Sequence, residues 1–147
     1  MIERDYIMRM LQMFFDAIAK VLNRNVPGIV PDIPELQRSF NEMYHQFFKK
    51  SPDHYYGIDK EEILVEIENE GYSEKDTYAK IQMLAELLYQ DALIKNNLHE
   101  RFALLEKSLY LLEYLDDKSR TFSWDRGGKI NDIKKALTEV KISDKNV

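Results

Sequence analysis

Two neighbouring apolar helices joined by a short turn constrain the fold of this chain more than any other feature. Apolar residues recur at three- and four-residue steps over residues 80–94 and again over residues 98–115, and Lys95, Asn96 and Asn97 separate the two runs. The apolar and small residues on two adjoining faces of the second run are Phe102, Leu104, Leu105, Ser108, Leu109, Leu111, Leu112 and Leu115. A helix apolar around most of its circumference belongs in a core, so we expect this hairpin at the centre of the molecule.

The rest of the chain is expected to complete one all-α domain over residues 1–147, a bundle of about six helices. Its parts are an N-terminal helix (1–22), a proline-rich linker (23–34), short helices (35–72), a central helical block (73–140) and a tail (141–147). Within these parts we expect helices over 4–22, 34–48, 59–70, 73–94, 98–115 and 129–140, a polar turn over 49–58 and a long connection over 116–128. The apolar stripe of 129–140 is narrow, which predicts a terminal helix covering the far side of 98–115.

Composition and charge exclude several classes of function. The 147 residues carry a net charge of −5, which disfavours general nucleic-acid binding, because that binding needs a basic face. There is no cysteine, so disulfides, thiolate metal sites and a cysteine nucleophile are excluded. No apolar run approaches the roughly 20 residues of a membrane span, and the N-terminus has no signal-peptide pattern. We expect a soluble, cytoplasmic protein with neither a membrane nor a nucleic acid as partner.

No combination of residues matches a common catalytic or metal site. Glu42 and His45 have the Glu-x-x-His spacing of di-iron bundles, but those sites need a second such pair, and neither His54 nor His99 has an acid three residues before it. Gly127-Gly128-Lys129 ends like a phosphate-binding loop but lacks the upstream glycine and the hydroxyl residue, so we read it as a linker. We therefore assign no catalytic, cofactor or metal residue and expect a protein that is not an enzyme. The alternative is a small-molecule-binding protein or enzyme whose pocket the sequence does not reveal; a polar pocket around a histidine would favour it.

A protein–protein interaction or scaffold role fits the composition better, because helices rich in Met and aromatic side chains suit contacts with other chains. The candidate contact residues are Phe122, Trp124, Arg126, Tyr114, Phe14 and Met10. The expected partner is another protein, or a second copy bound through the N-terminal helix. Phe122 and Trp124 have a second interpretation, in which they plug the end of the helical stack. The loop aromatics Tyr55 and Tyr56 are expected to cover the edge of the core.

The helical block over about 74–140 resembles the tetratricopeptide class of helical repeats. Ser108 falls at the small position of the second helix and Leu105 at the bulky position before it, whereas Tyr89, Ala92 and Arg101 depart from the pattern. The whole chain also resembles a family of small uncharacterised bacterial proteins with tetratricopeptide-like folds. That resemblance rests on residues 3–10, 109–115 and 122–126. Both resemblances imply a helical fold, and neither implies an activity or a peptide-binding groove.

Overall fold

The computed structural model describes residues 2–23, 30–119 and 123–145, and all regular structure in those ranges is helical. The helices are α1 (Ile2–Asn23), α2 (Ile33–Met43), a π-helical turn η1 (Tyr44–Phe48), α3 (Pro52–Gly57), α4 (Lys60–Glu68), α5 (Glu74–Leu93), α6 (Leu98–Lys118) and α7 (Trp124–Lys145). The predicted all-α class is confirmed. Among the described residues, no helix is long and apolar enough to span a membrane.

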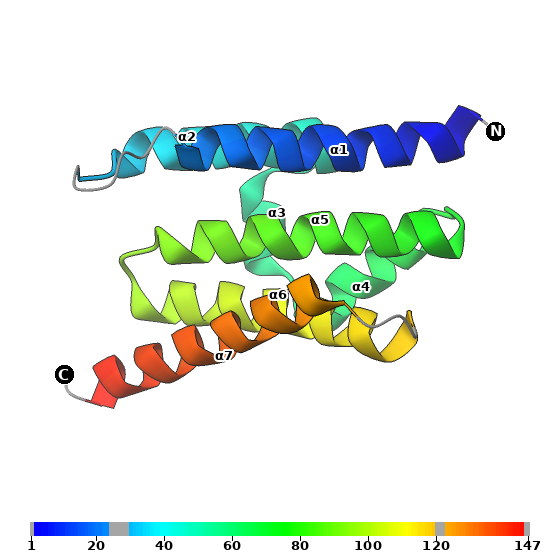
Figure 1. The fold of residues 1–147 in the computed structure, drawn as a ribbon. Coiled ribbons are helices and arrows are strands. Elements are labelled where there is room, and N and C mark those ends of the chain that lie inside the picture. Colours follow the sequence, from blue (N-terminus) through cyan, green and yellow to red (C-terminus); the bar gives the residue numbers. More distant parts are fainter. Residues whose placement is uncertain (1, 24–29, 120–122, 146–147) are drawn as a thin grey trace.

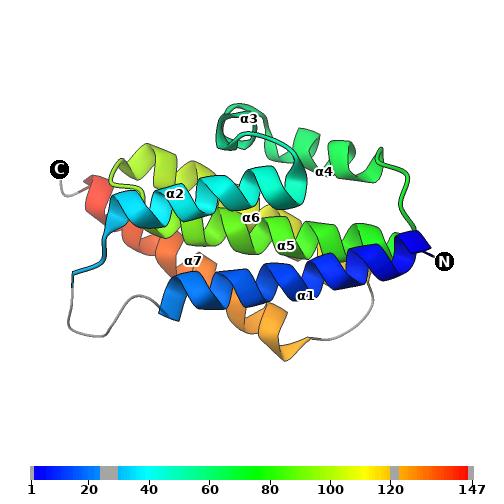
Figure 2. The ribbon, with the colours of Figure 1, turned by 90° about the horizontal axis from the view of Figure 1, so that it is seen from above.

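The helices form three tiers around the α5–α6 hairpin (Figure 1). Figure 2 shows α1 and α2 side by side above α5, with α3 and α4 on the side of the bundle away from α1. The hairpin is the most extensive helix pair, α1 packs mainly on α5, and α7 packs mainly on α6. The expectation that the last helix covers the outer side of α6 is therefore confirmed.

The hairpin is the centre of the core, as its sequence pattern predicted. Leu88 on α5 and both Leu105 and Leu111 on α6 are fully buried. Burying one such side chain contributes roughly 1.5–3 kcal/mol. Ser108 lies at the contact between the two helices, where its hydroxyl donates a hydrogen bond of 2.7 Å to the carbonyl oxygen of Ala85. Because the serine is small and its hydroxyl has an acceptor, the two helices approach closely with no unsatisfied polar atom at that point.

Side-chain caps fix the start of three helices. Asp32, Ser73 and Asn97 accept hydrogen bonds from backbone N–H groups three residues later, at the starts of α2, α5 and α6. Asp59 occupies the corresponding position before α4 but makes no such bond. Gly71 has φ of +80°, the left-handed conformation expected where the chain leaves α4.

Two segments differ from the sequence-based expectation. Residues 49–58 were predicted to be a polar turn, yet they contain α3, whose first residue, Pro52, has a φ already suited to a helix. The helix α7 begins at Trp124 and not at residue 129, so Gly127 and Gly128 are helical. Ser123 makes this start possible, because its hydroxyl accepts a hydrogen bond from the Arg126 N–H. The expected tail is also helical as far as Lys145, and most of the linker over 23–34 lies outside the described residues.

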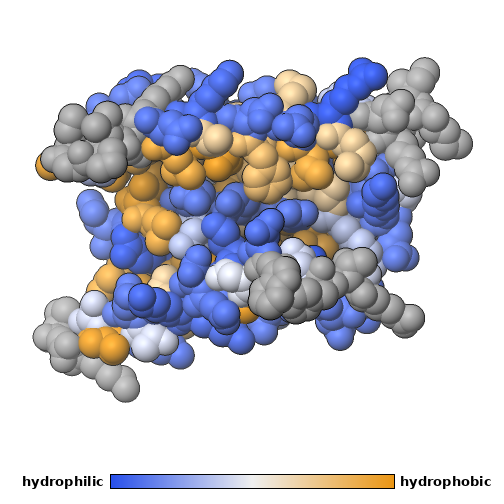
Figure 3. Space-filling view, viewed as in Figure 1, coloured by the Kyte–Doolittle hydropathy of each residue, from blue (hydrophilic) through white to orange (hydrophobic). Residues whose placement is uncertain are grey.

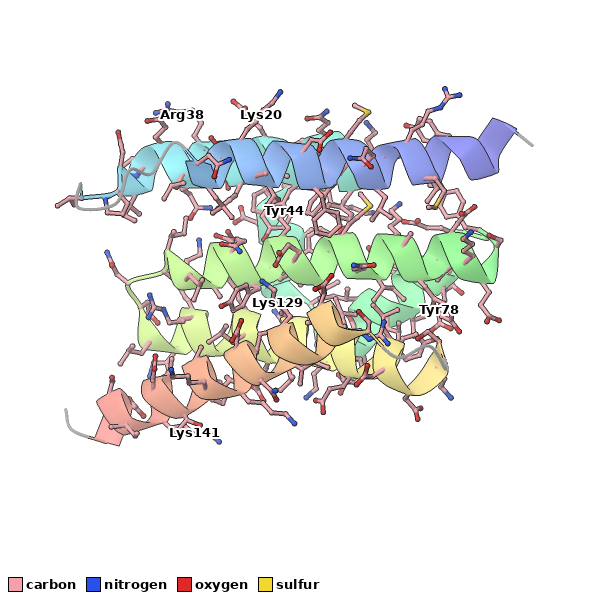
Figure 4. The ribbon with its side chains drawn as sticks, viewed as in Figure 1. Lys20, Arg38, Tyr44, Tyr78, Lys129 and Lys141 are labelled. Atoms are coloured by element: carbon pink, nitrogen blue, oxygen red, sulfur yellow. The ribbon has the colours of Figure 1, made fainter. Side chains whose placement is uncertain are left out.

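A buried polar network ties α2, η1 and α3 to α5. Its centre is the Asp91 carboxylate, which is fully buried, and Figure 4 shows Tyr44 lying between the upper tier and α5. Tyr44 donates a hydrogen bond of 2.8 Å to Oδ2 of Asp91, and Tyr56 donates to the same oxygen. Gln37 and Lys95 both approach Oδ1 at 3.2 Å. Burial, together with the Asp91 charge, raises the pKa of Tyr44 well above its ordinary value, so Tyr44 keeps the proton that it donates to Oδ2 of Asp91.

Candidate interaction groove between α1 and α7

Helix α1 carries more apolar surface than the core covers. Its core stripe, Ile7, Phe14, Ile18 and Val21, is buried. At 100° per residue, Met8, Leu11, Phe15 and Leu22 fall on one flank of that stripe. Of these, Met8 is 39% exposed and Leu22 is 36% exposed, while Leu11 and Phe15 are half-buried. Among the described residues, no other helix fully covers this flank, which is therefore an apolar strip.

This strip forms one wall of a groove that runs between α1 and α7 over the surface of α5. Figure 3 shows the apolar band along α1 on this face, with hydrophilic residues above and below it. The groove consists of two hollows of about 310 Å³ and 460 Å³, which share Gln82 and Arg126. Met8 and Leu11 line the larger hollow, and Phe15 lines the smaller one.

The opposite wall is charged, but its cations on α7 have partners within the molecule. Arg126 Nε lies 2.7 Å from Oδ1 of Asp116 on α6. Lys129 Nζ lies 3.2 Å from Oε2 of Glu86 on α5 and 4.5 Å from the centre of the Tyr89 ring. Figure 4 shows Lys129 between α5 and α7. Because these cations are already paired, the groove offers an incoming molecule apolar contact more than a charge of one sign.

The floor of the larger hollow is anchored by a pair of tyrosines. Tyr78 on α5 lines the hollow, and its hydroxyl donates a hydrogen bond of 3.4 Å to the carbonyl oxygen of Lys118. Its ring meets that of Tyr114 on α6 edge to face, with 6.4 Å between the ring centres. Burial raises the pKa of Tyr114. These contacts hold the first turns of α5 against the last turns of α6 beneath the groove.

The structure places the predicted contact residues in different environments. Arg126 lines both hollows, and Tyr114 supports the floor through Tyr78. Phe14 is fully buried, in edge-to-face contact with Phe15, Phe47 and Phe48, so its assignment as a contact residue is wrong. It lies on the same face of α1 as Ile7 and Val21, which the core needs. Met10 is half-buried on the flank of α1 away from the groove. Trp124 begins α7, but its side chain, like all of Phe122, lies outside the described residues.

The groove residues that sequence reasoning missed are Met8, Leu11 and Phe15 as one strip, together with Gln82 and Lys129. The three residues of the strip lie beside the core stripe of α1, but no sequence pattern shows which flank of that helix lacks a partner, and none indicates Gln82 or Lys129. The three histidines lie apart, but His99 lines a polar cavity between α3 and α6, which is the feature that favours the small-molecule-binding alternative. His45 is exposed, His54 lies 2.8 Å from both carboxylate oxygens of Glu66, and His99 is exposed at the start of α6. Within the described ranges, no group of three or more His, Asp or Glu side chains is placed to hold a metal ion.

Comparisons with protein-family models, with curated proteins and with solved structures found no match to this chain.

Proposed function

We propose that this protein is a non-enzymatic protein–protein interaction module, and that the groove between α1 and α7 holds an amphipathic helix of a partner protein. The observation that carries the proposal is the apolar strip of Met8, Leu11 and Phe15 facing a wall whose cations are already paired. The absence of cysteine from the sequence and the net charge of −5 support a cytoplasmic setting and a partner that is not a nucleic acid.

A helix fits this groove better than an extended peptide does. The two hollows follow α5 from Glu74 to Glu86, which at about 1.5 Å per residue is roughly 18 Å, the length of a helix of about 12 residues. Met8, Leu11 and Phe15 are spaced by three and four residues, so they interdigitate with apolar side chains at the same spacing on a partner helix. The groove has no free strand edge in the described part of the chain, which an extended peptide would need for backbone pairing.

A matched pair of methionines on α1 provides the test. Met8 lies on the groove flank and is 39% exposed, whereas Met13 lies on the other flank and is 53% exposed. A photo-cross-linking amino acid at position 11, which lines the larger hollow together with Met8, should capture a partner in native cells, and the captured residues should map to an amphipathic helix. Adding the substitution Met8→Glu to that variant should reduce the capture at least tenfold, because it places a charge against the apolar face of the partner.

The substitution Met13→Glu is the control, since it adds the same charge to the same helix outside the groove. Capture unchanged by Met8→Glu would refute the groove as the binding site. Mapping of the captured residues to an extended or loop segment would refute the helical partner. Circular dichroism of both variants shows whether either substitution perturbs folding.

A second candidate, self-association through α1, has its own observation. Tyr6, Met10, Met13 and Ala17 form the other apolar flank of α1, and Tyr6 and Met13 are both 53% exposed. This flank spans about 16 Å of helix, which is short for a stable interface and implies weak association. Sedimentation at high micromolar concentration tests it: Met13→Glu should shift a dimer to monomer, and a strictly monomeric wild-type protein excludes it.

A further inference from the structure

A cavity of about 460 Å³ lies between α3 and the first half of α6, on the side of the molecule away from the groove. Figure 2 shows α3 on that side. The lining residues come from α3, from the turn after α5 and from one face of α6; they are Asp53, Tyr56, Lys95, His99, Glu100, Ala103, Leu104 and Lys107. A cavity of this size accommodates a small metabolite.

Lys107 is the most buried charged group of this cavity, with 9% of its surface exposed. Its ammonium group donates hydrogen bonds of 2.8 Å and 3.0 Å to the carbonyl oxygens of Tyr55 and Tyr56, the last turn of α3. An ammonium has three N–H donors, and the third has no acceptor among the described residues. Lys107 therefore lines the cavity with unused hydrogen-bonding capacity.

Comparison with Lys80, which is buried, and with Lys95, which is half-buried, shows what Lys107 lacks. Lys80 is equally buried and is paired with the Glu70 carboxylate at 2.5 Å. Lys95 is paired with the Asp91 carboxylate at 3.2 Å and also donates to Gln37 and Tyr56, so all three of its donors are used. Lys107 has no carboxylate within ion-pair distance in the described part of the chain. A buried cation without a counter-ion is unfavourable, and an anion bound in the cavity would remove that cost.

We propose that this cavity binds a small zwitterion of the amino-acid class, with the ligand carboxylate on Lys107 and its ammonium group towards Asp53 and Glu100. Asp53 and Glu100 are both exposed and have no ion-pair partner in the described ranges, so they form an acidic entrance to a cavity with a basic inner end. A multiply charged anion such as phosphate would be repelled by these acids, whereas a zwitterion satisfies both ends.

The remaining lining groups favour the same ligand. Ala103 leaves space on the α6 wall, and Leu104 offers apolar contact for a ligand side chain. Tyr56 is held rigidly, because its hydroxyl donates to Asp91 and accepts from Lys95. Binding therefore does not require the ordering of the Tyr56 side chain.

The protonation of Lys107 gives a direct readout of the ligand carboxylate. Burial lowers the pKa of Lys107, and the Asp59 charge opposes this only in part. The charged or titratable groups around it are Asp53, Tyr56, Asp59, Lys95, His99 and Glu100. A carboxylate placed against the ammonium stabilises its charged form, so ligand binding must raise the pKa of Lys107.

The experiment uses the full chain with lysine labelled at Cε and the twenty L-amino acids as probes, with acetate, methylamine and inorganic phosphate as partial probes. At least one amino acid should move the Lys107 titration midpoint to higher pH, and calorimetry should show it binding at least tenfold tighter than acetate or phosphate. Lys107→Met should weaken this binding at least tenfold, while Lys80→Met, an equally buried lysine outside the cavity, should leave it unchanged. If Lys107→Met does not fold, the Cε resonance that is missing from the spectrum of Lys107→Arg identifies Lys107. The shift of the Lys107 titration midpoint in the unsubstituted protein then tests the proposal.

Asp53→Asn separates the two ends of the ligand. It should weaken amino-acid binding and leave acetate binding unchanged or stronger. The proposal is overturned if no amino acid moves the Lys107 midpoint, or if phosphate binds as tightly as every amino acid. Neither result affects the groove, because Met8→Glu and the cross-linking experiment concern the opposite side of the molecule.

Discussion

Replacing Asp91 by asparagine is the sharpest test of the structural reasoning, because four groups from four segments converge on this one carboxylate. Tyr44 and Tyr56 donate to Oδ2, and Gln37 and Lys95 approach Oδ1. Asparagine keeps the shape of the side chain but turns one acceptor oxygen into a donor NH₂ group. Whichever way the amide is oriented, two neighbouring donors face another donor.

The expected cost follows from the type of bond that is lost. Hydrogen bonds to a charged group contribute about 1.5–3 kcal/mol each, and removing one partner of a buried ion pair costs about 3–5 kcal/mol. The Lys95 side chain is only 14% exposed, so its charge would remain largely buried without its carboxylate. Because the tyrosine hydroxyls rotate and recover part of the loss, we expect Asp91→Asn to destabilise the protein by about 3–5 kcal/mol.

Urea unfolding followed by circular dichroism measures this change. With a slope of about 2 kcal/mol per molar urea, the midpoint should fall by roughly 2 M. The double variant Asp91→Asn with Lys95→Met should lose about 1–3 kcal/mol less than the sum of the single variants, because the second substitution removes the charge that the first leaves unpaired. Asp117→Asn is the matched control: its side chain is 78% exposed and lies 3.9 Å from Lys118, so its effect should stay below about 0.5 kcal/mol.

Two outcomes would refute the reasoning. A loss below about 1 kcal/mol for Asp91→Asn would mean that water reaches the carboxylate and that the network does not tie α2 and α3 to α5. Additive effects in the double variant would mean that Asp91 and Lys95 do not interact in the folded protein.

Two further predictions concern alkaline pH and the glycines. Folding keeps the pKa of Tyr44 above its ordinary value of 10.0, so the unfolded chain loses that proton first and stability should fall as pH rises above 10, by about 1.4 kcal/mol per pH unit for each such tyrosine. Tyr44→Phe should remove the contribution of one tyrosine from this dependence of the unfolding free energy on pH. Urea midpoints between pH 9 and 11 measure the dependence, and an unchanged slope would contradict the burial of Tyr44. Gly128→Ala should stabilise the protein by about 0.5–1 kcal/mol, because the position is helical and an added Cβ meets nothing within 4 Å. Gly71→Ala should destabilise by about 1 kcal/mol, because φ there is +80°, and thermal unfolding that ranked the two glycine variants the other way would refute this assignment.

The elements that sequence predicted well are those in which local signals agree. The periodicity that predicted α1, α5 and α6 depends on residues within one or two turns of each other, and the caps that Asp32, Ser73 and Asn97 form in the structure are equally local. The errors occur where one local signal conflicts with another or with a tertiary contact. Two successive glycines predict a linker, yet α7 continues through them, because Ser123 caps it and Arg126 pairs with Asp116 on α6.

The groove was only partly predictable for a related reason. Arg126 is among the predicted contact residues, and the sequence shows apolar side chains over much of α1. It did not show that Phe14 belongs to the core and Phe15 to the groove, because adjacent residues on a helix differ by 100° and the position of α5 decides which one is covered. That information lies in the packing of α1 on α5 and not in α1 itself.

Three lysines that are buried or half-buried show most clearly why interior chemistry cannot be derived from a single helix. All three lie in or beside the apolar hairpin: Lys80, Lys95 and Lys107. From its own helix alone, each would be interpreted as a side chain whose methylene groups cover the core while its ammonium group stays in water. Their actual partners come from elsewhere in the chain: Lys80 meets Glu70, Lys95 meets Asp91 together with Gln37 and Tyr56, and Lys107 meets only backbone carbonyls of α3. Because α3 ends against α6, its last carbonyl groups take the place that a carboxylate has in the other two pairs. The cavity beside Lys107 therefore follows from where one short helix ends, a boundary that the sequence pattern did not reveal.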